Sequence, residues 1–156
     1  MIKDRLRVQD ENYRKILFRL EKDEDGYPPD DWESVWAIEL SSELYRIANI
    51  PFFIYNISDG DIVRAAEMDG ELLFDQMVKP SGNSVIRVVV VDPSRVQQLR
   101  DELENLNCYS ELSHIKRLIA VDIPPEVSIG LVRTLLDEGE KQEIWSYEES
   151  SLRHDG

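Results

Sequence analysis

The chain has 156 residues, of which 42% are hydrophobic and 32% charged, and its formal net charge is −14. This composition predicts one domain or two small ones with a real core, and the negative charge argues against nucleic acid or an anionic membrane surface as a partner. The single cysteine excludes an internal disulfide. With no expected secretory signal and no apolar run long enough for a membrane span, it indicates a cytoplasmic protein.

Two stretches near the start alternate between apolar and polar residues. Residues 15–22 read KILFRLEK and residues 33–40 read ESVWAIEL, with the turn formers of DEDGYPPDD between them. Alternation of this kind predicts half-buried strands. One face carries Ile16, Phe18 and Leu20 in the first stretch, and Val35, Ala37 and Glu39 in the second.

Turn signals recur at short intervals through the first half. Asp69-Gly70, between two strand-like segments, is the strongest hairpin signal in the chain, and residues 81–83 read Ser-Gly-Asn, another turn. The first half, residues 1–83, is therefore predicted to be an antiparallel β meander that forms a small barrel or strongly curled sheet.

Residues 49–57, NIPFFIYNI, interrupt the meander. Pro51 lacks the N–H that a central ladder needs, so the segment is not expected to be a central strand. Its aromatic residues either fill a core or form the wall of a ligand pocket. Aromatic clusters in small domains usually belong to the core, and we favour that interpretation.

The second half changes character. SVIRVVVV, residues 84–91, predicts a central strand, and RLIAVDI, residues 117–123, predicts another buried strand. Asp92-Pro93 is a favoured helix start, and Pro124-Pro125-Glu126 is expected to open a second helix that ends near Gly139. Shorter strands are expected at residues 110–115 and 143–150. The apolar helix positions are predicted at Val96, Leu99, Leu103, Leu106, Val127, Leu131, Leu135 and Leu136.

The two strand–helix units repeat at an offset of 32 residues, which pairs Leu99 with Leu131 and Leu103 with Leu135. Together with the shorter strands, the order becomes β-α-β-β-α-β, the ferredoxin-like pattern. The predicted fold class is α+β. A β-rich subdomain, residues 1–83, packs beside a ferredoxin-like subdomain, residues 84–156, that ends in a short tail containing His154.

Several segments resemble one bacterial family of unknown function. They include the Gly-Tyr-Pro-Pro turn, the acid-Ser-Val-Trp strand, Asn-Ile-Pro-Phe-Phe, Gly-Asp-Ile-Val and Ser-Gly-Asn-Ser followed by Ile-Arg. In this order they resemble the domain-of-unknown-function family 4265. The resemblance covers most of the chain to about residue 91. It implies a bacterial origin and a small α+β domain, and it supplies no reaction, cofactor or catalytic residue.

No catalytic constellation stands out in the sequence. His114 and His154 are the two histidines, His154 lies in a tail expected to fray, and Cys108 is expected to be a small packing residue. Ser81 begins a short turn that lacks the lysine spacing of a phosphate loop. We therefore predict no enzyme, no cofactor and no metal site. Chance acid pairs such as Asp59 and Asp61 are expected in so acidic a chain.

The acidic loop before the second strand is the predicted partner-binding surface. Trp36 is assigned to the core, whereas Trp32, between two acids, is expected to be exposed as an anchor. The expected partner is a basic protein, a toxin domain, which makes the chain an acidic immunity or antitoxin-like protein. A small-molecule-sensing module is the alternative, and the oligomeric state is left open. The predicted partner-binding residues are Asp23, Glu24, Asp25, Asp30, Asp31 and Trp32.

Overall fold

A computed structural model describes residues 12–115 and 117–155. The chain divides into two compact units between Ser81 and Gly82. The fold is α+β: a five-stranded ring-like sheet comes first, and a four-stranded antiparallel sheet with two helices follows.

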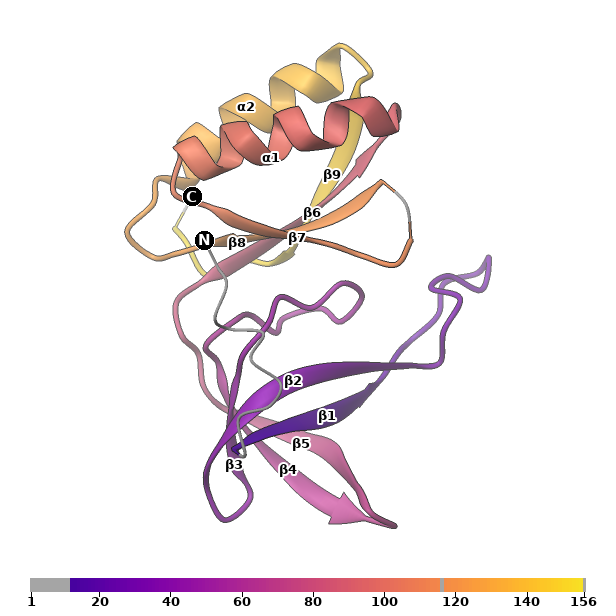
Figure 1. Ribbon diagram of the computed structural model, residues 1–156, viewed down its shortest axis with the longest axis vertical. Helices are drawn as coiled ribbons and strands as arrows, with labels where there is room; N and C mark the ends of the chain where they lie inside the picture. Colours follow the sequence, from indigo (N-terminus) through magenta and orange to yellow (C-terminus); the bar gives the residue numbers. More distant parts are fainter. Residues whose placement is uncertain (1–11, 116, 156) are drawn as a thin grey trace. The chain divides into compact units, whose positions relative to one another are not determined.

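The first unit is a meander whose last strand returns to the first (Figure 1). Each strand pairs antiparallel with the next, and β5 pairs parallel with β1. The hairpin predicted at Asp69-Gly70 is confirmed, because both residues have positive φ (54° and 85°) between β4 and β5. The strands are β1 (Tyr13–Arg19), β2 (Trp32–Ser41), β3 (Leu44–Ile47), β4 (Ile62–Met68) and β5 (Glu71–Lys79).

The inward face of this ring-like sheet follows the predicted alternation. The apolar side chains that share one face of the first two strand stretches are all buried: Ile16, Phe18, Leu20, Val35 and Ala37. The assignment of Trp36 to the core is wrong. Trp36 alternates with Val35 and Ala37 on β2, so it lies on the opposite face, half-buried against the Tyr13 ring and beneath the Lys15 ammonium.

The second unit is a sheet in the order β7-β8-β6-β9, with every neighbouring pair antiparallel. Both helices lie on one face of it (Figure 1), where they bury Leu99, Leu103, Val132 and Leu136 against the central strands. Its elements are β6 (Ser84–Val90), a 3-10 helix (Pro93–Arg95), α1 (Val96–Asn105), β7 (Tyr109–Leu112), β8 (Leu118–Ile123), α2 (Ile129–Lys141) and β9 (Trp145–Ser151).

The predicted start of the first helix is confirmed. The Asp92 carboxylate accepts a hydrogen bond from the Ser94 N–H at 3.0 Å, and Pro93 begins the short 3-10 helix that leads into α1. A capping carboxylate followed by proline satisfies the first free N–H groups and presets the helical φ.

The prediction for the second helix is wrong at both ends. Its N-cap is Ser128, whose hydroxyl accepts from the Leu131 N–H, so the helix begins at Ile129 and not at Glu126. The helix buries Val132 and Leu136, whereas Leu131 is 59% exposed, which breaks the expected repeat. Gly139 does not end the helix either. It lies inside α2, where the Trp145 ring packs against it.

Neither helix in the described part of the chain is long and apolar enough to cross a membrane. Within residues 12–115 and 117–155, no three His, Cys, Asp or Glu side chains gather as a metal site would require.

Candidate functional site

The ring-like sheet closes through a short ladder between β1 and β5. We call the line between these two strands the β1/β5 seam. Strands β1 and β5 pair only at Ile16–Leu72 and Leu17–Leu73, whereas the β1–β2 ladder continues to Arg19–Trp32. The β4–β5 register shifts twice in the stretch opposite Phe74–Lys79. Bulges of this kind bend a strand and increase its twist. The β1–β5 ladder ends at Leu73, and the Phe74 ring still stacks on the Phe18 ring, with the centroids 4.6 Å apart.

A cavity of about 510 Å³ occupies this seam. Its volume is within the range of about 300–1,000 Å³ that is typical of ligand pockets. Most of its wall is apolar or aromatic, and Arg19 is the one charged residue among the described residues that line it. The lining residues are Leu17, Phe18, Arg19, Trp32, Ile54, Tyr55, Asn56, Ile57, Leu73, Phe74 and Met77.

The segment 49–57 is both core and cavity wall. Ile50, Phe53 and Ile57 are buried, as the core interpretation predicts, but Tyr55 is 57% exposed and belongs to the cavity wall. The pocket-wall interpretation therefore also describes part of this segment. Its consecutive aromatic and aliphatic side chains face in two directions, and the sequence alone does not say which side is open.

Glu33 fixes this segment in place. Its carboxylate accepts hydrogen bonds from the main-chain N–H groups of Phe52 at 2.6 Å, Phe53 at 3.0 Å and Ile54 at 3.1 Å. Asn49 forms a fourth hydrogen bond that holds the segment, because its side-chain oxygen accepts from the Trp36 N–H at 2.6 Å. A carboxylate bound to several N–H groups holds a loop without regular secondary structure, so the cavity wall is preorganised.

Asp61 holds the other end of the same loop. Its side chain is fully buried, and its two carboxylate oxygens accept from the Ser58 N–H and the Ser81 N–H, each at 2.8 Å. The hydroxyl of Ser81 donates to the main-chain oxygen of Asp59 at 2.8 Å. Asp61 is thus a structural anchor, and the turn at Ser81 directs its N–H to this anchor instead of presenting it to an anion.

The predicted partner-binding acids lie in the loop between β1 and β2, and their environments differ. Asp23 accepts from the N–H groups of Asp25 and Tyr27, both at 2.9 Å, so its carboxylate is used within the loop. Lys22 donates to the main-chain oxygens of Pro28 and Asp30 and forms an ion pair with Asp31 at 3.4 Å. Glu24 and Asp25 are exposed.

Trp32 connects this acidic loop to the cavity. It is 42% exposed, as predicted, and it lines the cavity directly after Asp31. The Arg19 guanidinium lies over its ring, 5.3 Å from the ring centroid. Sequence reasoning missed Arg19, Phe74 and Met77 as cavity residues. Their pattern is that of ordinary strands, and only the end of the β1–β5 pairing brings them together.

The predicted absence of a reactive cysteine has a physical basis in the second unit. Cys108 is 2% exposed, and burial raises the pKa of its thiol from 9.0 to about 12. A thiol in this state is protonated at neutral pH and is a poor nucleophile. His114 is exposed in the turn between β7 and β8.

The prediction that His154 lies in a frayed tail is wrong. Its Nε2 is 2.9 Å from the Pro124 carbonyl oxygen, which only accepts, so Nε2 donates there, and Nδ1 is hydrogen-bonded to the Ser84 hydroxyl at 2.7 Å. The Ser84 oxygen also accepts from the N–H groups of Arg153 at 2.8 Å and His154 at 3.2 Å. Ser84 is 1% exposed, so this pair docks the C-terminal tail and does not form an accessible nucleophile.

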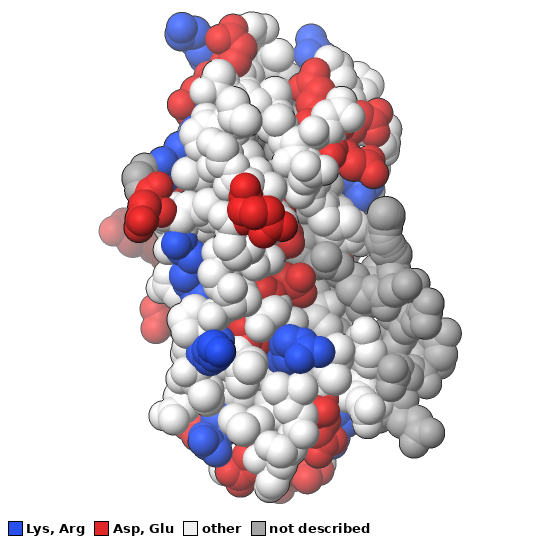
Figure 2. Space-filling model, turned by 90° about the vertical axis from the view of Figure 1, so that its left-hand side faces the viewer, with Lys and Arg blue, Asp and Glu red and all other residues white. Residues whose placement is uncertain are grey.

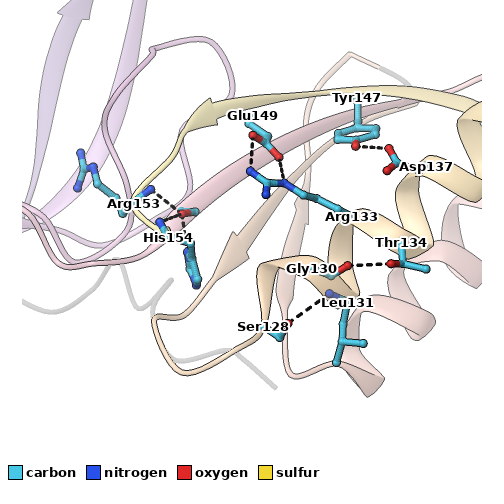
Figure 3. Close-up of polar contacts among 11 residues, drawn as sticks. Ser128, Gly130, Leu131, Arg133, Thr134, Asp137, Tyr147, Glu149, Arg153 and His154 are labelled. Carbon is cyan, nitrogen blue, oxygen red and sulfur yellow. Dashed lines mark hydrogen bonds and ion pairs between the residues drawn. The ribbon is translucent and has the colours of Figure 1, made fainter. Parts of the chain in front are cut away.

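Two polar pairs link α2 to β9 in the second unit. Arg133 on α2 reaches Glu149 on β9 with two hydrogen bonds, at 2.6 and 3.0 Å, and Tyr147 donates to Asp137 (Figure 3). On the face drawn in Figure 2, acidic clusters are separated by uncharged surface and by Lys and Arg groups. On that face the acidic side chains lie in separate groups, so a single loop can be more negative than the surface around it.

The profile of the family described as Domain of unknown function (DUF4265) matches residues 33–147, so the chain belongs to that family, as the resemblance predicted. A crystal structure described as a hypothetical protein from Neisseria gonorrhoeae is similar in fold, with a TM-score of 0.77 and 25% sequence identity. The match covers 89% of this chain and 94% of that chain. No curated protein matches the sequence.

Proposed function

We propose that this chain is an acidic immunity or antitoxin-like protein that binds a basic effector protein, a toxin domain, through the β1/β5 seam and the acidic loop beside it. The observation that supports this most is the direct junction of the two features at Trp32, an exposed aromatic residue in the wall of an apolar cavity. Interfaces combine a few aromatic anchors with charged surroundings in this way.

The two features have different tasks in this proposal. Residues 21–31 contain six acids and one lysine, so they attract a basic surface and accelerate encounter. The cavity then takes an apolar side chain of the partner, against Tyr55 and Trp32, and this contact slows dissociation. Lys22 and the inward bonding of Asp23 keep the loop ordered, which reduces the entropy lost on binding.

The proposal includes no catalysis and a cytoplasmic location. Three facts support the absence of catalysis: the thiol of Cys108 is buried, the Ser84 hydroxyl is buried under the tail, and Asp61 is bonded to main-chain N–H groups. We also assign the second unit to the ferredoxin-like pattern and the first to the small barrels. The order β6-α1-β7-β8-α2-β9 and the closure of β5 onto β1 support these assignments.

The experiment begins with capture of the partner on the immobilised chain, its identification, and its purification. We expect the association rate of the two purified proteins to fall at least tenfold between about 0.05 and about 0.5 M salt, because the screening length falls from roughly 14 to 4 Å. Reversing Glu24 and Asp25 to lysine should slow association similarly at low salt. Thermal stability should stay nearly unchanged, because both side chains are exposed.

The matched control reverses Glu104 and Glu126, two exposed acids of the second unit, and changes the net charge equally. It should slow association by less than threefold. Trp32→Ala should instead act on dissociation, with a loss of affinity of about tenfold or more. Association rates that do not change with salt, or that fall equally with both pairs of reversals, would overturn the proposal for this loop.

The cavity also supports the second candidate, a module that senses a small molecule. An apolar wall with one cation, Arg19, fits a small apolar acid. Decanoate is a suitable probe. Saturable binding below about 10 µM that Arg19→Gln abolishes, with no protein partner captured, would favour sensing over protein binding.

A further inference from the structure

The strand edges at the β1/β5 seam carry a further inference. The Leu20 N–H donates to the Asp31 oxygen and the Glu39 N–H donates to the Asn12 oxygen, so even-numbered residues of β1 direct their main-chain groups toward β2. In a strand the main-chain groups of successive residues face opposite sides. The main-chain N–H and C=O of Leu17 and Arg19 therefore face β5. Leu17 has its ladder partner there, and Arg19 lies beyond the last pair.

The opposite side of the seam is also a strand edge. Strand β5 continues from Phe74 to Lys79, where its ladder partner is β4 on one side and its pairing with β1 has ended. Exposed edges invite pairing with other chains, and proteins normally cover or bend them. Here the two edges border a cavity of about 510 Å³, and most of its wall is apolar.

We propose that an extended segment of the basic partner enters the β1/β5 seam as an added strand and pairs its main chain with Arg19. Alternate side chains of this segment enter the cavity, and the side chains between them, which are basic, point outward near the acidic loop. Strand addition of this kind obtains affinity from main-chain hydrogen bonds and specificity from every second side chain. The inference rests on the proposed function and specifies how the partner is held.

Charge and spacing support this occupant over others. The residue that ends the β1–β2 ladder, Trp32, follows directly on an acidic loop, so a segment lying along β1 passes close to that loop. A four-residue strand spans about 13 Å, and its apolar side chains recur on one face at every second position. A basic segment with alternating apolar residues therefore matches both the charge of the loop and the apolar wall.

The test uses a blocked heptapeptide of alternating lysine and valine, measured by fluorescence anisotropy with the full chain. Each residue is N-methylated in turn, which removes one main-chain donor. We expect methylation at one position, the residue whose N–H meets the Arg19 carbonyl, to weaken binding at least tenfold, and methylation at the two positions beside it to weaken binding less than threefold. A peptide of the same composition with the lysines in one block is the control and should bind at least tenfold more weakly.

A pair of variants isolates the main chain of Arg19. Arg19→Val and Arg19→Pro both remove the guanidinium, but only proline removes the N–H that faces the seam. The β1–β2 ladder does not use that N–H, and an edge position tolerates proline. Because both variants lose the guanidinium and its contact with Trp32, they are compared with each other, and we expect the proline variant to bind the peptide at least tenfold more weakly than the valine variant. The Arg19 amide of the parent chain should become protected from hydrogen exchange when the peptide is added.

The outcomes separate this inference from the proposed function. Peptide binding that responds to acid reversal but is indifferent to the position of methylation would overturn strand addition and leave the acidic binding surface standing. No peptide binding at 1 mM would likewise overturn strand addition. Salt-insensitive association with the purified partner would overturn the proposed function instead.

Discussion

The two units use their hydrogen-bonded polar side chains in opposite ways. In the second unit, Arg133 pairs with Glu149 and the Ser84 hydroxyl takes the C-terminal tail, so polar groups close the structure on itself. In the first unit, Glu33 and Asp61 bond to main-chain N–H groups of one loop and hold it beside an open cavity. A carboxylate whose hydrogen bonds are all made within the protein can therefore hold a cavity open as well as close a structure.

The closed packing of the second unit provides the largest expected effect. A Cβ on Gly139 would lie 2.1 Å from ring carbons of Trp145, closer than any real contact. Gly139→Ala should therefore lower the free energy of unfolding by about 3 kcal/mol or more, measured by urea denaturation. Gly130→Ala in the same helix is the control. Its Cβ meets only the Ser128 hydroxyl at 3.6 Å, and helix propensity should stabilise it by up to about 1 kcal/mol. Equal effects would contradict the close packing.

The first unit should respond most strongly at Glu33. Glu33→Ala removes the acceptor of three main-chain N–H groups and should cost about 2–3 kcal/mol, since hydrogen bonds to charged groups are among the stronger ones. Amides 52–54 should also exchange faster with solvent. Asp31→Ala is the control, because its carboxylate is exposed and paired only with Lys22, and it should cost about 0.5 kcal/mol or less. If both variants lose the same stability, Glu33 does not hold the cavity wall.

A smaller effect should appear in alkali and belongs to the second unit. The Cys108 thiol has a pKa of about 12 in the folded chain, because burial disfavours the thiolate, and an ordinary value of 9.0 when unfolded. Above pH 9 the unfolded chain therefore binds fewer protons than the folded one, so stability falls as pH rises toward 12. Relative to Cys108→Ala, the parent chain should lose about 1 kcal/mol between pH 8 and 10. Parallel stability profiles for the two chains would show that the thiol does not contribute.

Patterns between sequence neighbours predicted much of the fold. The alternation around Ile16 and Val35, the Asp69-Gly70 turn and the Asp92 cap are local signals with local causes, and the structure has each of them. The start of α2 was also a local question, but two signals competed there. The Ser128 hydroxyl prevailed over the proline pair, because it satisfies an N–H of the first turn.

Most of the candidate site depended on distant residues and could not be predicted in this way. Trp32 was recognised because it stands between two acids. Glu33 resembled one more acid of the loop, yet its partners are about twenty residues away. His154 is ordered by Ser84, seventy residues away in sequence. The cavity exists because pairing of β1 with β5 stops at Leu17, and no periodicity in either strand encodes that end.

The two-residue closure of the ring-like sheet has a consequence for the order of folding. Ile16 meets Leu72 across more than fifty residues of chain, and only one further pair supports that contact. The antiparallel hairpins of the meander can form from near neighbours, whereas this closure must first meet the entropy of a long loop. We therefore expect the seam to form last, and the amides of Leu17 and Leu73 to gain protection late during refolding. Until then β1 and β5 are two open edges, so the chain is most prone to aggregate in the final step of its folding.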